Sequence, residues 1–321
     1  MEKIIRLGLI GKPISHSKSP DIFAGFFSGE AISDAQYQLF ELNHIGELPQ
    51  LIVQNPLLGG FNVTIPYKKE IFQYLHAIDP KAQAIGAVNT VKIIRNSTDV
   101  SNTHPPKNDA RNIECGIELT NEPGSIVKSK IESNVQLIGY NTDFDGFEFA
   151  LKSLPHQHFE QAYILGTGGS SKAVAAVLTN CQIPFKKVSR DLKEGNNSIN
   201  QSFRASSEQN CTTKEIKGIL DEFSNSEFNI RTINYEEFLN SEFPENTLII
   251  NTTPLGMWPD VESCPPIPWN RLPQSTQFID LVYNPQETQL LKEAKLRGLF
   301  GINGLTMLQK QAEKAWEIFK K

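Results

Sequence analysis

The sequence predicts a two-domain α/β fold. Apolar, β-rich runs alternate along the chain with segments whose apolar residues recur at helical spacing, which is the pattern of α/β proteins. A length of 321 residues, at about 150 residues per domain, favours two domains. A glycine-rich turn between an expected strand and an expected helix adds the strand–turn–helix unit that is typical of dinucleotide-binding domains.

In the first half of the chain we expect four strands and two helices. Ser19 and Pro20 predict a helix start, with Ser19 as the cap and Pro20 as the first helical residue. Pro66 predicts the start of a second helix, whose apolar face includes Ile71 and Leu75. The expected strands are residues 4–10, 37–42, 60–64 and 88–94.

The second half repeats this alternation. Residues 141–143 (Asn-Thr-Asp) predict a capped helix with Phe144 and Phe147 on its apolar face. A helix follows the glycine-rich turn, and an apolar stripe from Leu305 to Phe319 predicts the last helix. The expected strands are residues 162–165, 186–189, 248–251 and 278–283.

Two polar segments, residues 95–135 and 193–227, lose the pattern. We interpret them as insertions, the first with a surface hairpin around residues 114–119.

Composition and charge exclude several classes of protein. With 39% hydrophobic and 21% charged residues, the chain is too apolar to be disordered. A formal net charge of −5 argues against a nucleic-acid scaffold, which normally has a basic face. No apolar run approaches the roughly 20 residues that cross a bilayer, and the N-terminus has no signal-peptide pattern. We therefore expect a cytoplasmic protein with no membrane or nucleic-acid partner.

The cysteines predict neither a disulfide framework nor a metal site. Cys115, Cys181, Cys211 and Cys264 are scattered, without a CxxC pair or a nearby pair of histidines. We expect reduced thiols and no bound metal.

The glycine-rich turn, residues 166–171 (GTGGSS), predicts a dinucleotide site. Glycines permit a tight turn, and the backbone N–H groups at the following helix start attract a pyrophosphate. Ser171 stands where the strict GxGxxG pattern has its third glycine, so an ordinary loop is the alternative.

The end of the next strand indicates which dinucleotide binds. Arg190 and the nearby Lys186, Lys187 and Lys193 favour the additional phosphate of NADP, through charge complementarity. Asp191 favours NAD if its carboxylate faces the ribose. NADP is the expected cofactor, and NAD remains the alternative.

Lys68 and Asp143 are the candidate acid–base groups. Reduction of a carbonyl by hydride requires a proton on its oxygen, and a lysine beside a carboxylate can supply it or accept it. Each residue also has a structural interpretation. Asp143 can cap a helix, and Lys68 is expected in a first helical turn, where a cation opposes the helix dipole.

Ser15, His16 and Ser17 precede the first helix. Small hydroxyl side chains beside free helix N–H groups can hold a carboxylate, or they can simply cap the helix. His16 is a possible base, but a histidine between serines is more often a turn residue.

A series of motifs in this order resembles the shikimate dehydrogenase family. They run nearly from end to end of the chain, and so many ordered motifs are far more specific than any one of them. The motifs are residues 11–20 (GKPISHSKSP), 62–68 (NVTIPYK), 86–90 (GAVNT), 139–143 (GYNTD), 166–169 (GTGG), 251–257 (NTTPLGM), 280–285 (DLVYNP) and 304–311 (GLTMLQKQ).

The resemblance implies an oxidoreductase that reversibly reduces 3-dehydroshikimate to shikimate with NADPH, a step of aromatic amino-acid biosynthesis. It implies that Lys68 is the catalytic lysine and Asp143 its acidic partner. The implied substrate-binding residues are Ser15 and Ser17 for the carboxylate, Thr64, Asn89, Asp143 and Gln311 for the ring hydroxyls, and Tyr283 beside the substrate. The implied cofactor-binding residues are Gly166, Thr167, Gly168, Gly169 and Ser170 for the pyrophosphate, Ser189 and Arg190 for the adenosine phosphate, and Thr252, Leu281 and Gly304 near the nicotinamide.

The family fold implies an N-terminal α/β substrate-binding domain, residues 1–142 with 304–321, and a Rossmann-type NADP-binding domain, residues 143–303. A monomer or a homodimer is expected. The chain departs from the family in its long insertions and in Ser189-Arg190-Asp191, where the family usually has Asn-Arg-Thr. The alternatives are a quinate/shikimate dehydrogenase that uses NAD and a non-catalytic nucleotide-sensing homologue.

Overall fold

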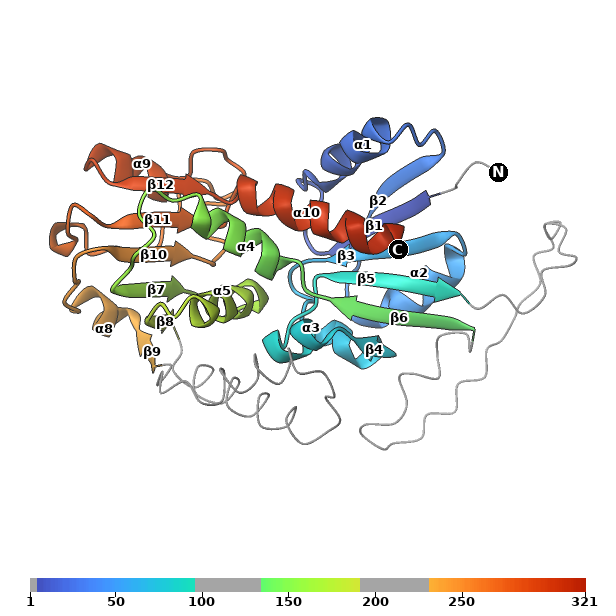
Figure 1. Ribbon diagram of the computed structural model, residues 1–321, viewed down its shortest axis with the longest axis horizontal. Helices are drawn as coiled ribbons and strands as arrows, with labels where there is room; N and C mark the ends of the chain where they lie inside the picture. Colours follow the sequence, from blue (N-terminus) through green and yellow to red (C-terminus); the bar gives the residue numbers. More distant parts are fainter. Residues whose placement is uncertain (1–4, 96–133, 191–230) are drawn as a thin grey trace, which may run out of the picture.

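The computed structural model describes residues 5–95, 134–190 and 231–321, which form two lobes side by side (Figure 1). Each lobe is built on a six-stranded sheet. The expected hairpin at 114–119, the insertion at 193–227 and the residues Cys115, Asp191, Lys193 and Cys211 lie outside the described residues.

The sheet of the first lobe is mixed, with strand order β2-β1-β3-β5-β6-β4. β1 pairs in parallel with β2 and β3, whereas β5 is antiparallel to β3 and β6. Because β1 and β3 are parallel, the segments that follow Gly11 and Val63 leave the sheet at the same edge. The strands are β1 (Ile5–Gly11), β2 (Ala35–Glu41), β3 (Leu58–Val63), β4 (Ala77–Ile78), β5 (Thr90–Arg95) and β6 (Val135–Tyr140).

Helices cover both faces of this sheet. On one face, Phe23 and Phe27 of α1 pack with Trp316 of α10, because residues four apart share a helix face. On the other face, apolar side chains of the strands pack against η1, α2, η2 and α3. The helices of this lobe are α1 (Ser19–Gly29), η1 (Ile45–Glu47), α2 (Leu48–Gln54), η2 (Glu70–Tyr74), α3 (Pro80–Ile85) and α10 (Leu305–Lys320).

The sheet of the second lobe is parallel throughout, with strand order β12-β11-β10-β7-β8-β9. This is the doubly wound order, in which the winding reverses between β7 and β10 and ligands bind beyond the carboxyl ends of the strands at that point. The strands are β7 (Gln161–Leu165), β8 (Phe185–Ser189), β9 (Arg231–Asn234), β10 (Thr247–Asn251), β11 (Gln277–Asp280) and β12 (Phe300–Asn303).

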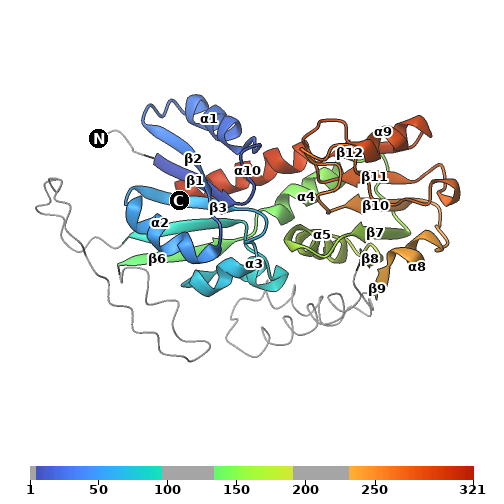
Figure 2. The same cartoon turned by 180° about the vertical axis from the view of Figure 1, so that it is seen from behind.

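Alternation along β7 shows how this second core is made. Ala162 and Ile164 face α4 and α5, whereas Tyr163 and Leu165 face α8 and α9. The helices are α4 (Asp143–Lys152), α5 (Gly169–Asn180), α8 (Tyr235–Leu239), the short η4 (Trp269–Arg271) and α9 (Gln289–Leu296). Opposite views show α4 and α10 lying against each other where the lobes meet (Figures 1 and 2).

The predicted α/β fold is confirmed, but some local predictions are wrong. Pro66 opens no α-helix: residues 65–69 form turns, and a 3₁₀ helix starts only at Glu70. The Lys68 carbonyl accepts a hydrogen bond from the Val88 amide at 2.9 Å instead of one within a helix. The predicted opposition between Lys68 and a helix dipole therefore does not arise.

The ends of most other predicted elements differ by one to three residues. Lys18 occupies the cap position of α1, so Ser19 is the first helical residue. The strand expected to reach Tyr283 ends at Asp280, whose side chain accepts the Val282 amide and turns the chain. Apart from the segment after Pro66, the bodies of the predicted strands and helices lie where the hydrophobic spacing places them.

Candidate active site

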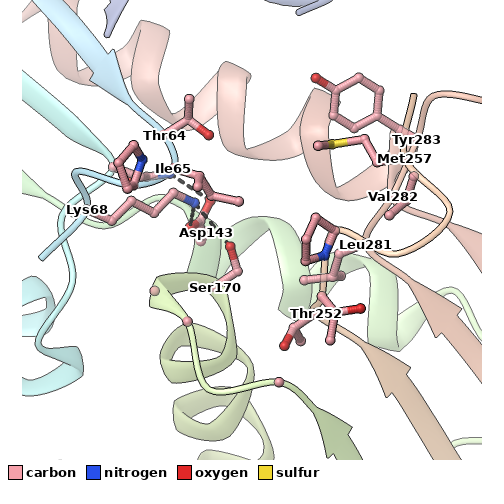
Figure 3. A pocket seen from close by; sticks show the side chains of 18 of the residues that line it. Thr64, Ile65, Lys68, Asp143, Ser170, Thr252, Met257, Leu281, Val282 and Tyr283 are labelled. Atoms are coloured by element: carbon pink, nitrogen blue, oxygen red, sulfur yellow. Dashed lines mark hydrogen bonds and ion pairs between the residues drawn. The ribbon is translucent and has the colours of Figure 1, made fainter. Parts of the chain in front are cut away.

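A cavity of about 1310 Å³ lies between the two lobes and is lined by both. Figure 3 shows its wall, with Lys68 and Thr64 from the first lobe facing Ser170 and Thr252 from the second. The catalytic, substrate-binding and cofactor-binding residues that the family resemblance implies all line this cavity except Ser15, which is exposed and lies outside it.

Lys68 and Asp143 form a buried ion pair. The Lys68 ammonium donates to the Asp143 carboxylate at 2.5 Å, and their side chains are only 11% and 6% exposed. Lys68 comes from the turn after β3, and Asp143 begins α4, where Asn141 rather than Asp143 accepts a helix amide, that of Phe144. Asp143 is therefore not needed as the cap, and its carboxylate instead pairs with Lys68 at the cavity wall.

The Asn89 side chain fixes the other carboxylate oxygen. Its amide nitrogen lies 2.8 Å from Asp143 Oδ1, 3.0 Å from Thr142 Oγ1 and 3.2 Å from Gln311 Oε1. Its carbonyl accepts the Thr142 amide at 2.8 Å. With both oxygens of Asp143 bonded and its charge paired, the buried carboxylate is electrostatically compensated.

A group of hydroxyls forms another part of the wall. The Ser17 hydroxyl accepts the Ser19 amide at 3.2 Å and lies 3.1 Å from the Ser19 hydroxyl, at the start of α1. The Tyr283 hydroxyl reaches across from the second lobe to Ser17 and the Lys18 backbone. Burial raises the pKa of Tyr283, which keeps the phenol neutral and able to donate a hydrogen bond.

The turn between β7 and α5 fits a dinucleotide pyrophosphate. Gly166 has φ of +107°, a conformation that favours glycine. Gly168 precedes the 12-residue helix α5 with no side-chain cap, and a Cβ placed there would meet no atom within 4 Å. The uncapped start of α5 therefore lies at the wall of the cavity, where a phosphate would be attracted.

The remaining residues predicted to bind cofactor line the same cavity. Ser189 and Arg190 stand at the end of β8, next to the glycine turn. Leu281 and Gly304 touch: a Cβ on Gly304 would lie 2.1 Å from the Leu281 carbonyl oxygen, so only glycine fits. Thr252 follows β10 and donates to the Leu165 carbonyl at 2.7 Å.

Lys186 and Lys187, two of the three lysines expected near the adenosine phosphate, do not line the cavity. Lys187 is 5% exposed, and burial, together with Lys172 and Lys69, lowers its pKa to about 7. The Lys186 ammonium lies 5.7 Å from the centre of the Tyr163 ring. The structure corrects this prediction, and the charge argument for NADP depends on Arg190 alone among the described residues.

Sequence reasoning missed Asn62 and left His16 unassigned. Asn62 is buried in the wall, accepts the Tyr37 hydroxyl at 2.8 Å and donates to Thr90 Oγ1 at 3.0 Å. It stands on β3, two residues before Thr64, and alternation along the predicted strand 60–64 could have placed both on one face. His16 lines the cavity with an unpartnered, buried Nδ1, and its ring lies 6.1 Å from that of Trp258 in the other lobe.

Within residues 5–95, 134–190 and 231–321, no cluster of three or more His, Cys, Asp or Glu side chains is arranged to hold a metal. Cys181 and Cys264 carry free thiols. No helix in the described part of the chain has the length and apolar character that spanning a membrane requires.

Comparisons with known proteins find relatives that match nearly the whole chain. The family model described as "Shikimate dehydrogenase substrate binding domain" matches residues 9–91. The shikimate dehydrogenase (NADP(+)) of Methanococcus vannielii is 33% identical over 99% of this chain and 92% of its own length. That of Methanosphaera stadtmanae is 31% identical, again over 99% and 92%.

Solved structures give the same result. A shikimate dehydrogenase crystallised with NADP+ is 29% identical, with a TM-score of 0.70 over 98% of this chain and 90% of that one. Shikimate dehydrogenase 1 from Peptoclostridium difficile is 28% identical, with a TM-score of 0.67 over 99% and 92%.

Proposed function

The chain belongs to the shikimate dehydrogenase family, and we propose that it catalyses the reversible NADPH-dependent reduction of 3-dehydroshikimate to shikimate. The single observation that carries the proposal is the Lys68–Asp143 pair, which lies in one cavity with a glycine turn that fits a dinucleotide. The names of the relatives supply the substrate and the cofactor.

We assign the two ligands to different lobes. Residues 1–142 with 304–321 form the proposed substrate-binding domain, and residues 143–303 form the proposed dinucleotide-binding domain. The doubly wound parallel sheet with its glycine turn supports the second assignment. The placement of Lys68, Asn89 and Gln311 around one polar wall supports the first.

Lys68 is the proposed acid–base residue. Bound NADPH supplies the hydride that reduces the carbonyl carbon. As negative charge develops on the substrate oxygen, the Lys68 ammonium stabilises it and donates a proton. In the oxidative direction the lysine accepts the proton from the substrate hydroxyl. Asp143 holds the ammonium in place through the 2.5 Å contact and balances its charge in a buried site.

The other polar residues bind and orient the substrate. Ser17 and Ser15, before the start of α1, are proposed to hold the carboxylate, with Tyr283 alongside. Exclusion of water between the lobes would strengthen these contacts. The proposed ring-hydroxyl ligands are Thr64, Asn89, Asp143 and Gln311, which all line the cavity.

The chain's own residues also define where the dinucleotide would lie. Free N–H groups at the start of α5 suit the pyrophosphate, and the Arg190 guanidinium suits the additional phosphate of NADP. Thr252, Leu281 and Gly304 form the proposed nicotinamide side of the cavity.

One absorbance assay of the reduced nicotinamide tests the proposal, with shikimate or quinate as substrate and NADP+ or NAD+ as cofactor. We expect shikimate with NADP+ to give the highest kcat/KM. Faster turnover of quinate with NAD+ would instead identify a quinate/shikimate dehydrogenase. Cofactor binding without turnover of either acid would indicate a nucleotide-sensing protein.

A further inference from the structure

Ser170 of the glycine turn makes a direct contact with the proposed catalytic lysine. The Lys68 ammonium donates to the Ser170 hydroxyl at 3.2 Å, although the two residues are 102 positions apart and belong to different lobes. Figure 3 shows the Ser170 side chain directed towards Lys68 and Asp143. The Lys68 ammonium therefore bridges Asp143, at the start of α4, and Ser170, in the turn before α5.

The backbone of this turn also packs against the lysine. A Cβ added to Gly169 would lie 3.0 Å from Lys68 Cβ and 3.2 Å from its Cδ. Glycine thus permits the turn to approach the alkyl chain closely, and Lys68 is held along its length as well as at its ammonium.

The Ser170 hydroxyl is not used to build the turn itself. The neighbouring Ser171 is fully buried and donates to the Gly168 carbonyl at 2.7 Å, which fixes the first turn of α5. No side chain caps α5. Ser170, half-buried in the cavity wall, is therefore available to groups within the cavity.

The hydrogen-bonding capacity of the three groups determines what Ser170 can do. A lysine ammonium has three donors, and here one is directed to Asp143 and one to Ser170, which leaves one for the substrate oxygen. Ser170 accepts from Lys68, so its own O–H can donate to an anion at the start of α5. A hydrogen bond to such an anion would make the serine oxygen a better acceptor for the ammonium.

We propose that Ser170 is a positioning residue that couples occupancy of the dinucleotide turn to the alignment of the Lys68 ammonium. This inference rests on the proposed function of the site. A ligand bound at the dinucleotide turn that orients Ser170 and Lys68 therefore tightens substrate binding. By thermodynamic linkage, bound substrate then tightens dinucleotide binding by the same factor.

Equilibrium binding tests this coupling without turnover. Shikimate and NADPH are both reduced and cannot react together. The Kd of shikimate is therefore measured by calorimetry twice, once without NADPH and once with NADPH bound. In the unaltered protein we expect NADPH to tighten shikimate binding by roughly fivefold or more, the lower range of allosteric coupling. In Ser170→Ala we expect this ratio to approach one, with each ligand still bound alone. Ser170→Thr keeps the hydroxyl and is expected to restore the ratio.

The possible outcomes are distinct. A coupling ratio in Ser170→Ala within twofold of that in the unaltered protein overturns the inference, and so does a ratio that Ser170→Thr fails to restore while the variant remains folded. Thermal unfolding of each variant checks the fold. If the unaltered protein binds neither shikimate nor NADPH, the proposed function itself fails, which is a different result from equal coupling in the two proteins.

Discussion

The Asn89 amide and the Gln311 carbonyl lie 3.2 Å apart, although 222 residues separate them in the chain. Gln311 belongs to α10, which returns after the whole second lobe to pack against the first sheet. The same Asn89 nitrogen lies 2.8 Å from Asp143 Oδ1. The last helix is therefore joined to the proposed acid–base pair through a single amide.

Gln311→Ala should raise the KM for shikimate by roughly fivefold, because a hydrogen bond between the neutral amide and a ring hydroxyl contributes about 1 kcal/mol. We expect a smaller effect on kcat, since Asn89 still holds Asp143. Steady-state kinetics check this split. Lys314→Ala is the control: it lies on the same helix and pairs with Glu317, away from the cavity lining. An equal rise in KM in that variant would indicate a general effect on α10.

Lys68→Ala should lower kcat by roughly a hundred- to ten-thousandfold, the usual loss when an acid–base group is removed. Asp143 keeps its bond from Asn89 but loses its charge partner, so we expect the same fold with a lower stability. Lys69→Ala is the matched comparison, because Lys69 is the next residue and lines the same cavity but is exposed. A much smaller loss is expected there. Near-normal turnover of Lys68→Ala would remove Lys68 from the mechanism.

Hydrophobic spacing predicted the alternating strands and helices because that signal is local. The apolar run at 162–165 predicts β7, and the glycines after it predict the start of α5. The position of Lys68 beside Asp143 is not local: it depends on two segments 75 residues apart meeting between lobes. Residue chemistry alone left Asp143 as acid–base partner or cap, and the ordered family motifs favoured the first.

The failed predictions share a physical cause, which is competition from tertiary contacts. Pro66 is compatible with a helix start, but the Lys68 carbonyl bonds to Val88 instead. Lys187 is a charged residue near the end of β8, but its side chain is buried in the second lobe. Asn62 belongs to the cavity wall because Tyr37 and Thr90, from other strands, hold its side chain.

The paired variants Ser17→Ala and Ser15→Ala test how the carboxylate is held. Ser17 lines the cavity beside Tyr283, whereas Ser15 is exposed outside it. We expect Ser17→Ala to raise the KM for shikimate by about tenfold, from the loss of one hydrogen bond to a charged ligand, and Ser15→Ala to raise it less. Equal effects would show that Ser15 contacts the substrate in the complex. Unchanged KM in both would indicate that the serines only support the start of α1.

Arg190→Ala should reduce the preference for NADP+. Arg190 lines the cavity at the end of β8, and a charge-assisted hydrogen bond from its guanidinium to a phosphate would contribute about 1.5–3 kcal/mol. We expect the KM for NADP+ to rise by roughly ten- to a hundredfold and the KM for NAD+ to change little, because NAD+ lacks that phosphate. A similar rise in both KM values would show that Arg190 contacts a group that NADP+ and NAD+ share, and not the additional phosphate.

Asp280 connects the second core to the segment that carries Leu281 and Tyr283. It is fully buried and accepts hydrogen bonds from Thr288 at 2.6 Å, Asn251 at 2.9 Å and the Val282 amide at 3.0 Å. Burial raises the pKa of Asp280 to about 6, against the opposing effect of these three donors.

The free energy of unfolding should therefore depend on pH through Asp280. Its pKa in the folded state, about 6, exceeds its ordinary value of 3.8, so the protonated form favours the fold. This stabilisation is complete below a pH of about 4 and is lost as the pH rises through about 6. About two pKa units correspond to at most roughly 3 kcal/mol. The side chain of the Asp280→Asn variant cannot titrate. The free energy of unfolding of the unaltered protein, minus that of the variant, should therefore fall as the pH rises from about 4 to about 6. Urea unfolding of both proteins at several pH values measures it, and a difference that stays constant with pH would contradict a raised pKa at Asp280.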